Sequence, residues 1–266
     1  MKRQEWKETL QKLEAAMRQV AETKESGLRH GIKFAVVSEL ASQYFCEKKV
    51  ELVRIYGKTE TEATLLGKEA HEALLKDTVK VSREAFLQDV FSGRTILGRE
   101  TPLVAIHSGM PVAGLPDAVL FFKKMPLLLF EYKFTRSNYP HRDHHVQARL
   151  YCYLLHLLGF DTSRLRYAII LASPDLKGDD VFRENSTKMI IKNIRKDKFE
   201  AYKKGSSIAT AYLSNFYPRE AIEDMEWALE YWQRKREAIP TRKPVKCRTC
   251  EFNSTCDASL ARPSPT

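Results

Sequence analysis

The sequence has no apolar run long enough to cross a membrane, although 43% of its 266 residues are hydrophobic. Its first residues carry charges where a signal peptide needs an apolar core. It has only five cysteines, and an odd number in a cytoplasmic chain argues against a disulfide framework. We therefore expect a soluble cytoplasmic protein with no membrane partner, built on a hydrophobic core rather than on disulfides.

Positive charge, by contrast, is in excess. The chain has 44 lysines and arginines against 34 aspartates and glutamates, which gives a formal net charge of +10. An excess of this size favours a polyanionic partner, most often nucleic acid or a membrane surface. A merely basic surface would give the same count, so the charge needs a site beside it.

The first part of the chain is expected to be helical. Apolar residues at steps of three and four predict an amphipathic helix over residues 4–25, followed by a hinge between Ser26 and Gly31. Further helices are expected over 60–76 and 82–91, and one that begins at Ser38 as its N-cap.

The pattern then changes to apolar runs separated by Gly or Pro. These runs predict strands over 99–107, 112–122 and 126–134, a helix over 144–158, a strand over 165–172, an edge strand over 189–193 and a last helix over 218–236. This order predicts a mixed central sheet flanked by helices in one α/β domain. We expect four regions, namely an N-terminal helix and linker (1–30), a helical region (31–98), a core (99–200) and a C-terminal helix with a cysteine loop (201–266), of which 262–266 are expected to be disordered.

Two of the most apolar segments contain charged residues. Asp117 closes a Gly-Leu-Pro-Asp turn before Ala-Val-Leu-Phe-Phe, and Glu131 and Lys133 follow Leu-Leu-Leu-Phe. A buried charge costs several kcal/mol unless it is paired or binds a metal. Carboxylates on neighbouring strands can converge on one Mg²⁺ or Mn²⁺ ion. Residues two apart on a strand share a face, so Lys133 would lie beside that ion. The alternative is a buried ion pair.

Three cysteines near the C-terminus form the pattern Cys247-x2-Cys250-x5-Cys256. Such spacing is typical of a metal site or an iron–sulfur cluster, and the spacing alone does not distinguish zinc from iron. Cys152 lies in an apolar helical segment, where a cysteine is more often a small core residue.

Taken in order, these motifs resemble the PD-(D/E)xK nuclease superfamily in the form used by RecB-type nucleases. Asp117 with Glu131-Tyr-Lys133 resembles its core motif, Gly67-x3-His71 its upstream element and Gln147-x3-Tyr151 its later helical motif. Cys46, followed far downstream by the three clustered cysteines, resembles the split cluster of the iron–sulfur subgroup. The sequence from about Val37 to Asp257 is most similar to the CRISPR-associated RecB-like exonucleases, the fourth family of Cas proteins.

The resemblance implies a restriction-endonuclease-like fold, with an iron–sulfur region joining the helical N-terminal part to the C-terminus. It implies Mn²⁺ or Mg²⁺ bound by His71, Asp117, Glu131 and the backbone carbonyl of Tyr132. It implies catalysis by Asp117, Glu131, Lys133 and Gln147, and a [4Fe–4S] cluster, rather than zinc, on Cys46, Cys247, Cys250 and Cys256. The implied activity is a 5′-to-3′ exonuclease on single-stranded DNA ends, which trims new CRISPR spacers with an integrase complex as partner.

The loop over 136–145 mixes positive charge with an aromatic ring, as a groove for a single strand would. The candidate DNA contacts are Arg136, His141, Arg142 and Tyr151, although a solvated loop and, for Tyr151, core packing are alternatives. Glu100 could be an outer acid of the site. Neighbours on a helix point in different directions, so we expect no zinc at His144 and His145. The functional alternatives are a RecB-like repair or replication nuclease outside CRISPR, and a weakly catalytic DNA-binding adaptor.

Overall fold

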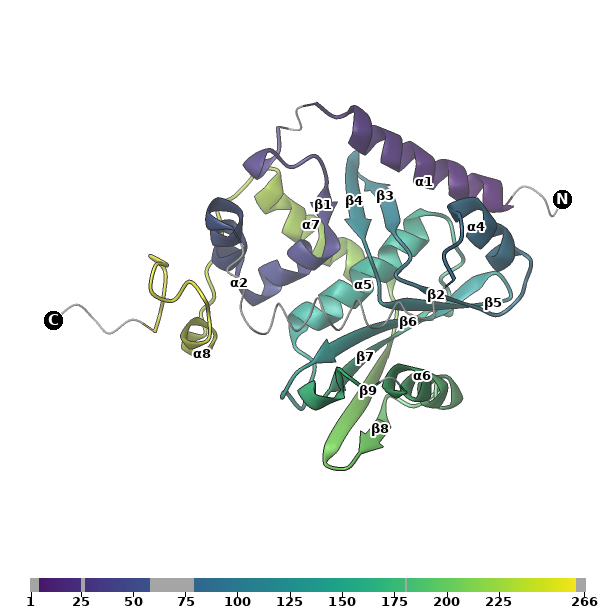
Figure 1. Ribbon diagram of the computed structural model, residues 1–266. Helices are drawn as coiled ribbons and strands as arrows, with labels where there is room; N and C mark the ends of the chain where they lie inside the picture. The colour runs from purple at the N-terminus through teal and green to yellow at the C-terminus, as the bar shows by residue number, and fades with distance from the viewer. Residues whose placement is uncertain (1–4, 25–26, 58–78, 180, 262–266) are drawn as a thin grey trace.

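The computed structural model describes residues 5–24, 27–57, 79–179 and 181–261. It contains two sheets with helices on both sides (Figure 1). The strands are β1 (Ala35–Val36), β2 (Ile96–Arg99), β3 (Leu103–His107), β4 (Met110–Gly114), β5 (Ala118–Phe122), β6 (Met125–Phe134), β7 (Arg166–Ala172), β8 (Lys198–Lys204) and β9 (Ser207–Asn215). The helices are α1 (Glu5–Glu22), α2 (Val37–Tyr56), α4 (Arg83–Phe91), α5 (Arg142–Leu157), α6 (Phe182–Lys192), α7 (Pro218–Trp232) and α8 (Pro244–Arg248), with short 3-10 turns η1 (Arg29–Gly31) and η2 (Pro174–Leu176).

The larger sheet has the strand order β2-β5-β6-β7-β9-β8 and is mixed, because β6 and β7 run parallel while the other neighbours are antiparallel. The smaller sheet has the order β1-β4-β3. Leu129 and Ile169 face a core shared with α5 and α7, whereas Phe130 and Ile170 face a second core under α6. Apolar packing on both faces explains why β6 is an almost continuous hydrophobic run.

Helix α1 packs on this body rather than extending from it. Leu13 and Ala16 are buried, and the Gln19 side chain donates a hydrogen bond of 2.7 Å to the carbonyl of Gly109 in the β3–β4 turn. None of the described helices combines the length and the apolar character needed to cross a membrane.

Several expected elements are confirmed with small changes of boundary, namely α1, α4, β6, α5, β7 and α7. The expected strands over 99–107 and 112–122 are each divided between the two sheets. The first breaks at Glu100 to Pro102 and the second at Leu115 to Asp117. Pro102 and Pro116 have no N–H to donate to a ladder, which favours a break at both places.

The edge strand expected over 189–193 is wrong, because these residues end helix α6 and the turn after it. Phe182, Ser186 and Ile190 are buried at helical spacing, and this packing overrides the strand preference of the local Met-Ile-Ile run. Strands β8 and β9, which complete the larger sheet, were not predicted from the sequence, and the boundary expected at residue 200 falls inside β8.

Ser38 is not the N-cap that the sequence suggested. Helix α2 begins at Val37, and the capping position is Val36, which still belongs to β1 and pairs with β4. The helix expected over 60–76, which includes His71, the start of the expected hinge at Ser26 and the tail over 262–266 lie outside the described residues.

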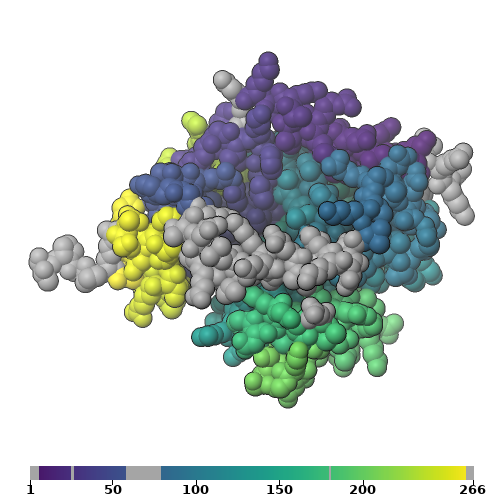
Figure 2. Space-filling view, viewed as in Figure 1, coloured from purple at the N-terminus to yellow at the C-terminus, as the bar shows by residue number. Residues whose placement is uncertain are grey.

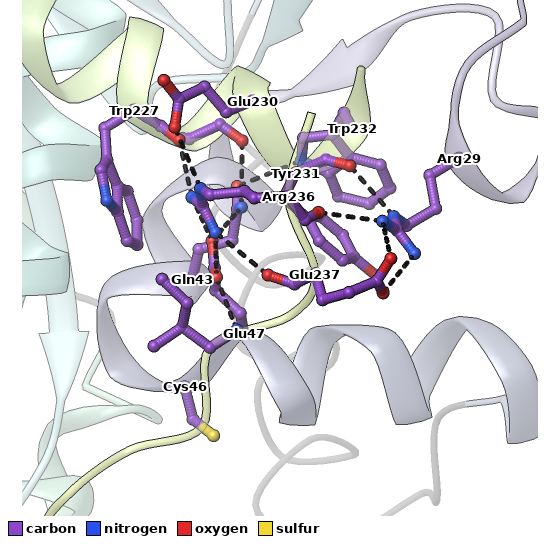
Figure 3. Close-up of polar contacts among 12 residues, drawn as sticks. Arg29, Gln43, Cys46, Glu47, Trp227, Glu230, Tyr231, Trp232, Arg236 and Glu237 are labelled. Atoms are coloured by element: carbon purple, nitrogen blue, oxygen red, sulfur yellow. Dashed lines mark hydrogen bonds and ion pairs between the residues drawn. The ribbon is translucent and has the colours of Figure 1, made fainter. Parts of the chain in front are cut away.

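The segment after α7 packs against helix α2, where a buried ion pair holds it (Figure 3). Glu47 of α2 is fully buried, and both of its carboxylate oxygens accept hydrogen bonds from the Arg236 guanidinium. The Ile239 N–H donates to the same carboxylate at 2.8 Å. Arg236 also lies over the Trp227 ring, 4.4 Å from its centroid. The chain beyond α7 is thereby fixed against α2, and Figure 2 shows the C-terminal segment seated beside that helix.

The Gln43 side chain extends this network into the core. Its Nε2 donates to Glu47 at 2.7 Å and to the carbonyl of Ala228 at 3.0 Å, while its oxygen accepts from the Trp232 indole at 3.1 Å. Every polar atom of this buried amide group therefore has a partner, which is the condition under which a buried polar network is stabilising.

Arg236→Met is expected to lower the free energy of unfolding by about 3–5 kcal/mol, because it leaves the Glu47 charge buried without its main partner. The double variant with Glu47→Gln should lose less than the sum of the two single variants, because it removes the stranded charge as well. Urea unfolding measures both values.

Arg219→Met is the matched control on α7. Arg219 is 90% exposed and pairs with Glu223 one turn away, so its loss should cost less than about 0.5 kcal/mol. An equal cost for Arg219→Met and Arg236→Met would show that the buried pair has no special weight.

Candidate active site and cysteine pocket

Asp117 lies where the chain passes from the smaller sheet to the larger one, directly after Pro116 and before β5. Its side chain is 6% exposed, and its Oδ2 accepts a hydrogen bond of 2.7 Å from the Tyr132 N–H. Its carbonyl accepts a hydrogen bond of 3.2 Å from the Glu100 N–H. Glu100 has φ 42°, in the left-handed region that non-glycine residues seldom adopt. Asp117 is therefore held from two strands at once.

Glu131 and Lys133 lie on the same face of β6, as their spacing predicts. Glu131 is 4% exposed, and its Oε1 lies 2.8 Å from the Lys133 ammonium. The ammonium also donates a hydrogen bond of 2.8 Å to the Gln147 side-chain oxygen on α5. Tyr132, between them, faces the opposite core, where its ring meets Phe182. The structure therefore brings the two residues of β6 together with Gln147 of α5.

The protonation state of Lys133 follows from its surroundings. Burial acts to lower the pKa of the ammonium, but the charge and hydrogen bond of Glu131 and the charges of Asp117 and Asp143 outweigh it and raise the pKa. Lys133 is consequently a cation at neutral pH. It can stabilise negative charge and orient water, but it has no free lone pair with which to act as a base.

Tyr151 is a packed residue whose hydroxyl reaches the site. Its side chain is 4% exposed, and the hydroxyl accepts a hydrogen bond of 3.0 Å from Gln147. Burial, with the nearby Glu131 charge, raises its pKa. A Cβ on Gly114 would lie only 2.7 Å from the Tyr151 ring, so glycine is required there by this close approach. A ring buried in this way does not offer a stacking face to DNA.

The other residues expected to contact DNA lie on the surface. Arg136, His141 and Arg142 are exposed, and the Tyr139 ring beside them is 63% exposed. Arg142 also lies over the Tyr44 ring, 4.7 Å from its centroid. His145 hydrogen-bonds to the Tyr167 hydroxyl at 3.1 Å rather than sharing a ligand with its neighbour His144.

Three residues near the site were missed in the sequence. Asp143 and His144 open α5 close enough to Lys133 for their charges to interact. Burial lowers the pKa of His144 to about 4, while the Asp143 charge opposes this shift and the Lys133 charge adds to it, so this ring is neutral at pH 7. The spacing of Asp143, Gln147 and Tyr151, four residues apart on one helix face, was the available signal. The third is Arg183 of α6, whose burial has no signature in the sequence.

The cysteines from the two ends of the chain line one small cavity. Cys46, Cys247, Cys250 and Cys256 all border it, together with apolar neighbours such as Phe45 and Leu52. Burial raises the pKa of the Cys250 and Cys256 thiols, and the proximity of Cys46 adds to both shifts. Cys152 lies apart, fully buried in the core of α5, where burial raises its thiol pKa as well.

A break in helix α2 presents Cys46 to this cavity. Cys46 has φ −170° and ψ 115°, which are extended rather than helical values. The Lys246 ammonium binds two carbonyls next to the break, that of Phe45 at 2.9 Å and that of Tyr44 at 3.4 Å. The Thr241 N–H donates to the Cys46 sulfur at 3.4 Å, a contact that also suits a metal-bound thiolate.

The donor chemistry of the two places differs. Asp117, Glu131 and the Tyr132 carbonyl are hard oxygen donors that suit Mg²⁺ or Mn²⁺. Four thiols suit zinc or an iron–sulfur cluster. Within the described residues, no three His, Cys, Asp or Glu side chains already stand at metal-binding distance. All four thiols border one cavity of about 20 Å³, so the donor set that either group needs comes together at one place.

A known protein family matches most of the chain. The model of the PD-(D/E)XK nuclease superfamily matches residues 7–257. No curated protein matches the chain significantly. A solved structure described as "Crystal structure of SSO0001" is similar over 95% of this chain and 96% of that chain, with 18% identity and a TM-score of 0.48. Because the family match covers most of the chain, the protein belongs to the PD-(D/E)XK nuclease superfamily.

Proposed function

We propose that the protein is a metal-dependent DNA exonuclease with an iron–sulfur cluster, which acts 5′-to-3′ on single-stranded ends and processes DNA for CRISPR spacer acquisition. One observation supports hydrolysis best. Asp117, Glu131, Lys133 and Gln147 lie close together where the chain passes from the smaller sheet to the larger one. The cleavage polarity, the CRISPR role and an integrase complex as partner rest on the sequence resemblance.

In this proposal, Asp117, Glu131, the Tyr132 carbonyl and His71 hold the cation. When bound, Mg²⁺ or Mn²⁺ supplies Lewis-acid activation of water and of the phosphodiester. The hydrogen bond from the Tyr132 N–H fixes the Asp117 carboxylate, so the backbone of Tyr132, whose carbonyl is the proposed ligand, lies beside that carboxylate. Asp117 and Glu131 are both almost fully buried, and a divalent cation would offset part of the cost of burying two carboxylates.

In the same proposal, Lys133 acts on the phosphate and the water rather than on the metal ion. Its ammonium is held 2.8 Å from both Glu131 and Gln147, so it enters the reaction already oriented. A cation in this position stabilises the negative charge that develops on the phosphate during attack, and it can orient the attacking water. Gln147 is in turn held by Tyr151, which makes it the positioning residue for the ammonium.

The proposed cluster region is separate from hydrolysis. Cys46, Cys247, Cys250 and Cys256 would bind the [4Fe–4S] cluster, and ligands from both chain ends would join α2 to the segment after α7. Such a link closes a very long loop, so we assign it a role in stability and in positioning DNA.

Lys133→Ala is expected to reduce the cleavage rate by about 10²–10³-fold, the typical cost of one group that stabilises charge in the transition state. Mn²⁺ affinity should be nearly unchanged. Asp117→Asn and Glu131→Gln should lose Mn²⁺ binding together with activity. End-labelled single and double strands measure cleavage, with and without Mn²⁺, and calorimetric titration measures the metal.

Equal loss of Mn²⁺ in all three variants would contradict the separate roles given to Lys133 and the carboxylates. A wild-type protein that binds strands but never cleaves them in Mn²⁺ or Mg²⁺ would instead favour the weakly catalytic adaptor. Lys192→Ala, an exposed charge at the end of α6, is the control for a simple loss of surface charge.

DNA affinity is expected to fall steeply with salt, because the net charge of +10 implies phosphate contacts that release counterions. On a single strand, the slope of log K against log salt should be about −0.7 per phosphate contacted. Fluorescence anisotropy at several salt concentrations gives this slope. An affinity that does not change with salt would show that the basic surface is not where DNA binds.

Protein purified without oxygen is expected to be brown, with broad absorbance near about 400 nm from sulfur-to-iron charge transfer. Alanine at any of the four cavity cysteines should reduce both iron content and thermal stability. Cys152→Ala is the matched control, because its thiol lies in the core and should leave the iron in place. Stoichiometric zinc in a colourless anaerobic preparation would refute the cluster, as would iron retained after the loss of Cys46.

A further inference from the structure

A cavity of about 1160 Å³ lies along the edge strand β2, near the site that contains the carboxylates. Its lining includes Arg99 and Glu100 at the end of β2 and Arg183 of α6. Arg99 pairs with Ala118 across the sheet, and the Glu100 N–H binds the Asp117 carbonyl. Arg99 and Glu100, which line the cavity, therefore lie directly beside Ala118 and Asp117.

Arg183 is the unusual member of this lining. Arg183 is only 7% exposed, and its Nε has no hydrogen-bond partner within the described part of the chain. The guanidinium lies over the Tyr132 ring, 4.9 Å from its centroid. The ring face attracts the guanidinium, but it does not replace the hydrogen-bond acceptor that the buried Nε lacks.

The electrostatic surroundings of Arg183 indicate what could complete it. Burial lowers its pKa, and the attraction of Asp117 opposes this shift most strongly. Arginine nevertheless stays protonated in proteins. A metal ion on Asp117 would neutralise that attraction and leave the guanidinium in greater need of an anion. Its planar group of N–H donors matches the geometry of a phosphate.

We propose that Arg183, with Arg99 beside it, binds a backbone phosphate of the nucleic-acid strand next to the phosphodiester that is cleaved, and that the cavity along β2 receives this part of the strand. The inference rests on the proposed nuclease function. Glu100 and Glu184 line the same rim, so diffuse positive charge there is weak. The contact therefore depends on the fixed position of Arg183, and it is a local one.

A scan with neutral phosphates tests this contact. A set of labelled single strands, each with one methylphosphonate, is bound without Mg²⁺ or Mn²⁺, and the cleaved bond is located separately by cleavage in Mn²⁺. For the wild-type protein, neutralising the phosphate next to that bond should weaken binding by roughly tenfold or more, as expected for a charge-assisted hydrogen bond. Arg183→Met should weaken binding to the unmodified strand by a similar factor.

The decisive result is the coupling between the two changes. Arg183→Met keeps an apolar stem against Tyr132 but removes the charge, so it should become insensitive to the methylphosphonate at that position. Lys188→Met, on the same helix and 69% exposed, removes one charge from the surface and should keep the full sensitivity. An Arg183→Met protein that retains the wild-type sensitivity would overturn the proposal.

Two further measurements keep the outcomes distinct. If Arg183→Met does not fold, as judged by urea unfolding, Arg183→Lys preserves the charge without the planar donor group, and it should show a reduced but measurable sensitivity. A wild-type protein that neither binds nor cleaves strands refutes the nuclease function itself. One that cleaves, but is insensitive to every single methylphosphonate next to the cleaved bond, refutes only the role of Arg183. Competition by free inorganic phosphate, with no such position effect, would assign the cavity to a free anion instead.

Discussion

The Tyr132 N–H donates to the Asp117 carboxylate at 2.7 Å across the end of β5, at the point where the chain leaves the smaller sheet for the larger. This bond ties a buried charge to the backbone of the central strand. On that strand, β6, Glu131 and Lys133 lie on the α5 side and the Tyr132 ring lies on the α6 side. A buried carboxylate is tolerable only with such partners, so the turn, the strand and both flanking helices share one electrostatic constraint.

The residues around the site lie on two opposite faces of the larger sheet. The α5 face holds the groups that would act on the reacting phosphate, because Lys133, Gln147 and Tyr151 form one chain of hydrogen bonds there. The α6 face holds Arg183 over the back of the same strand. Asp117 interacts electrostatically with both Lys133 and Arg183. In the proposed contact, a nucleic-acid strand that met both Lys133 and Arg183 would therefore pass beside Asp117 and the end of β2.

The sequence predicted those parts whose signal is local. The apolar run of β6 and the amphipathic pattern of α5 gave correct elements, and the spacing of Glu131 and Lys133 gave their shared face. The division of two predicted strands between two sheets, and the helix in place of an edge strand at 189–193, depend on packing with distant residues. Strand β8 is rich in polar residues and lies at the edge of the larger sheet, which weakens its pattern, and β9 beside it buries mainly small side chains such as Ala209 and Ala211. The burial of Arg183 is likewise set by tertiary contacts alone.

The ion pair of Glu47 and Arg236 joins residues 189 positions apart, and the cysteines around it come from the same two distant segments. During synthesis, a chain emerges from its N-terminus and its earlier parts fold first. Helix α2 and the larger sheet are therefore complete in the nascent chain before Arg236 exists. Glu47 therefore has no arginine partner until Arg236 has been synthesised, so the Glu47–Arg236 pair and the cysteine cavity beside it can form only after helix α2 and the strands of the larger sheet have been made.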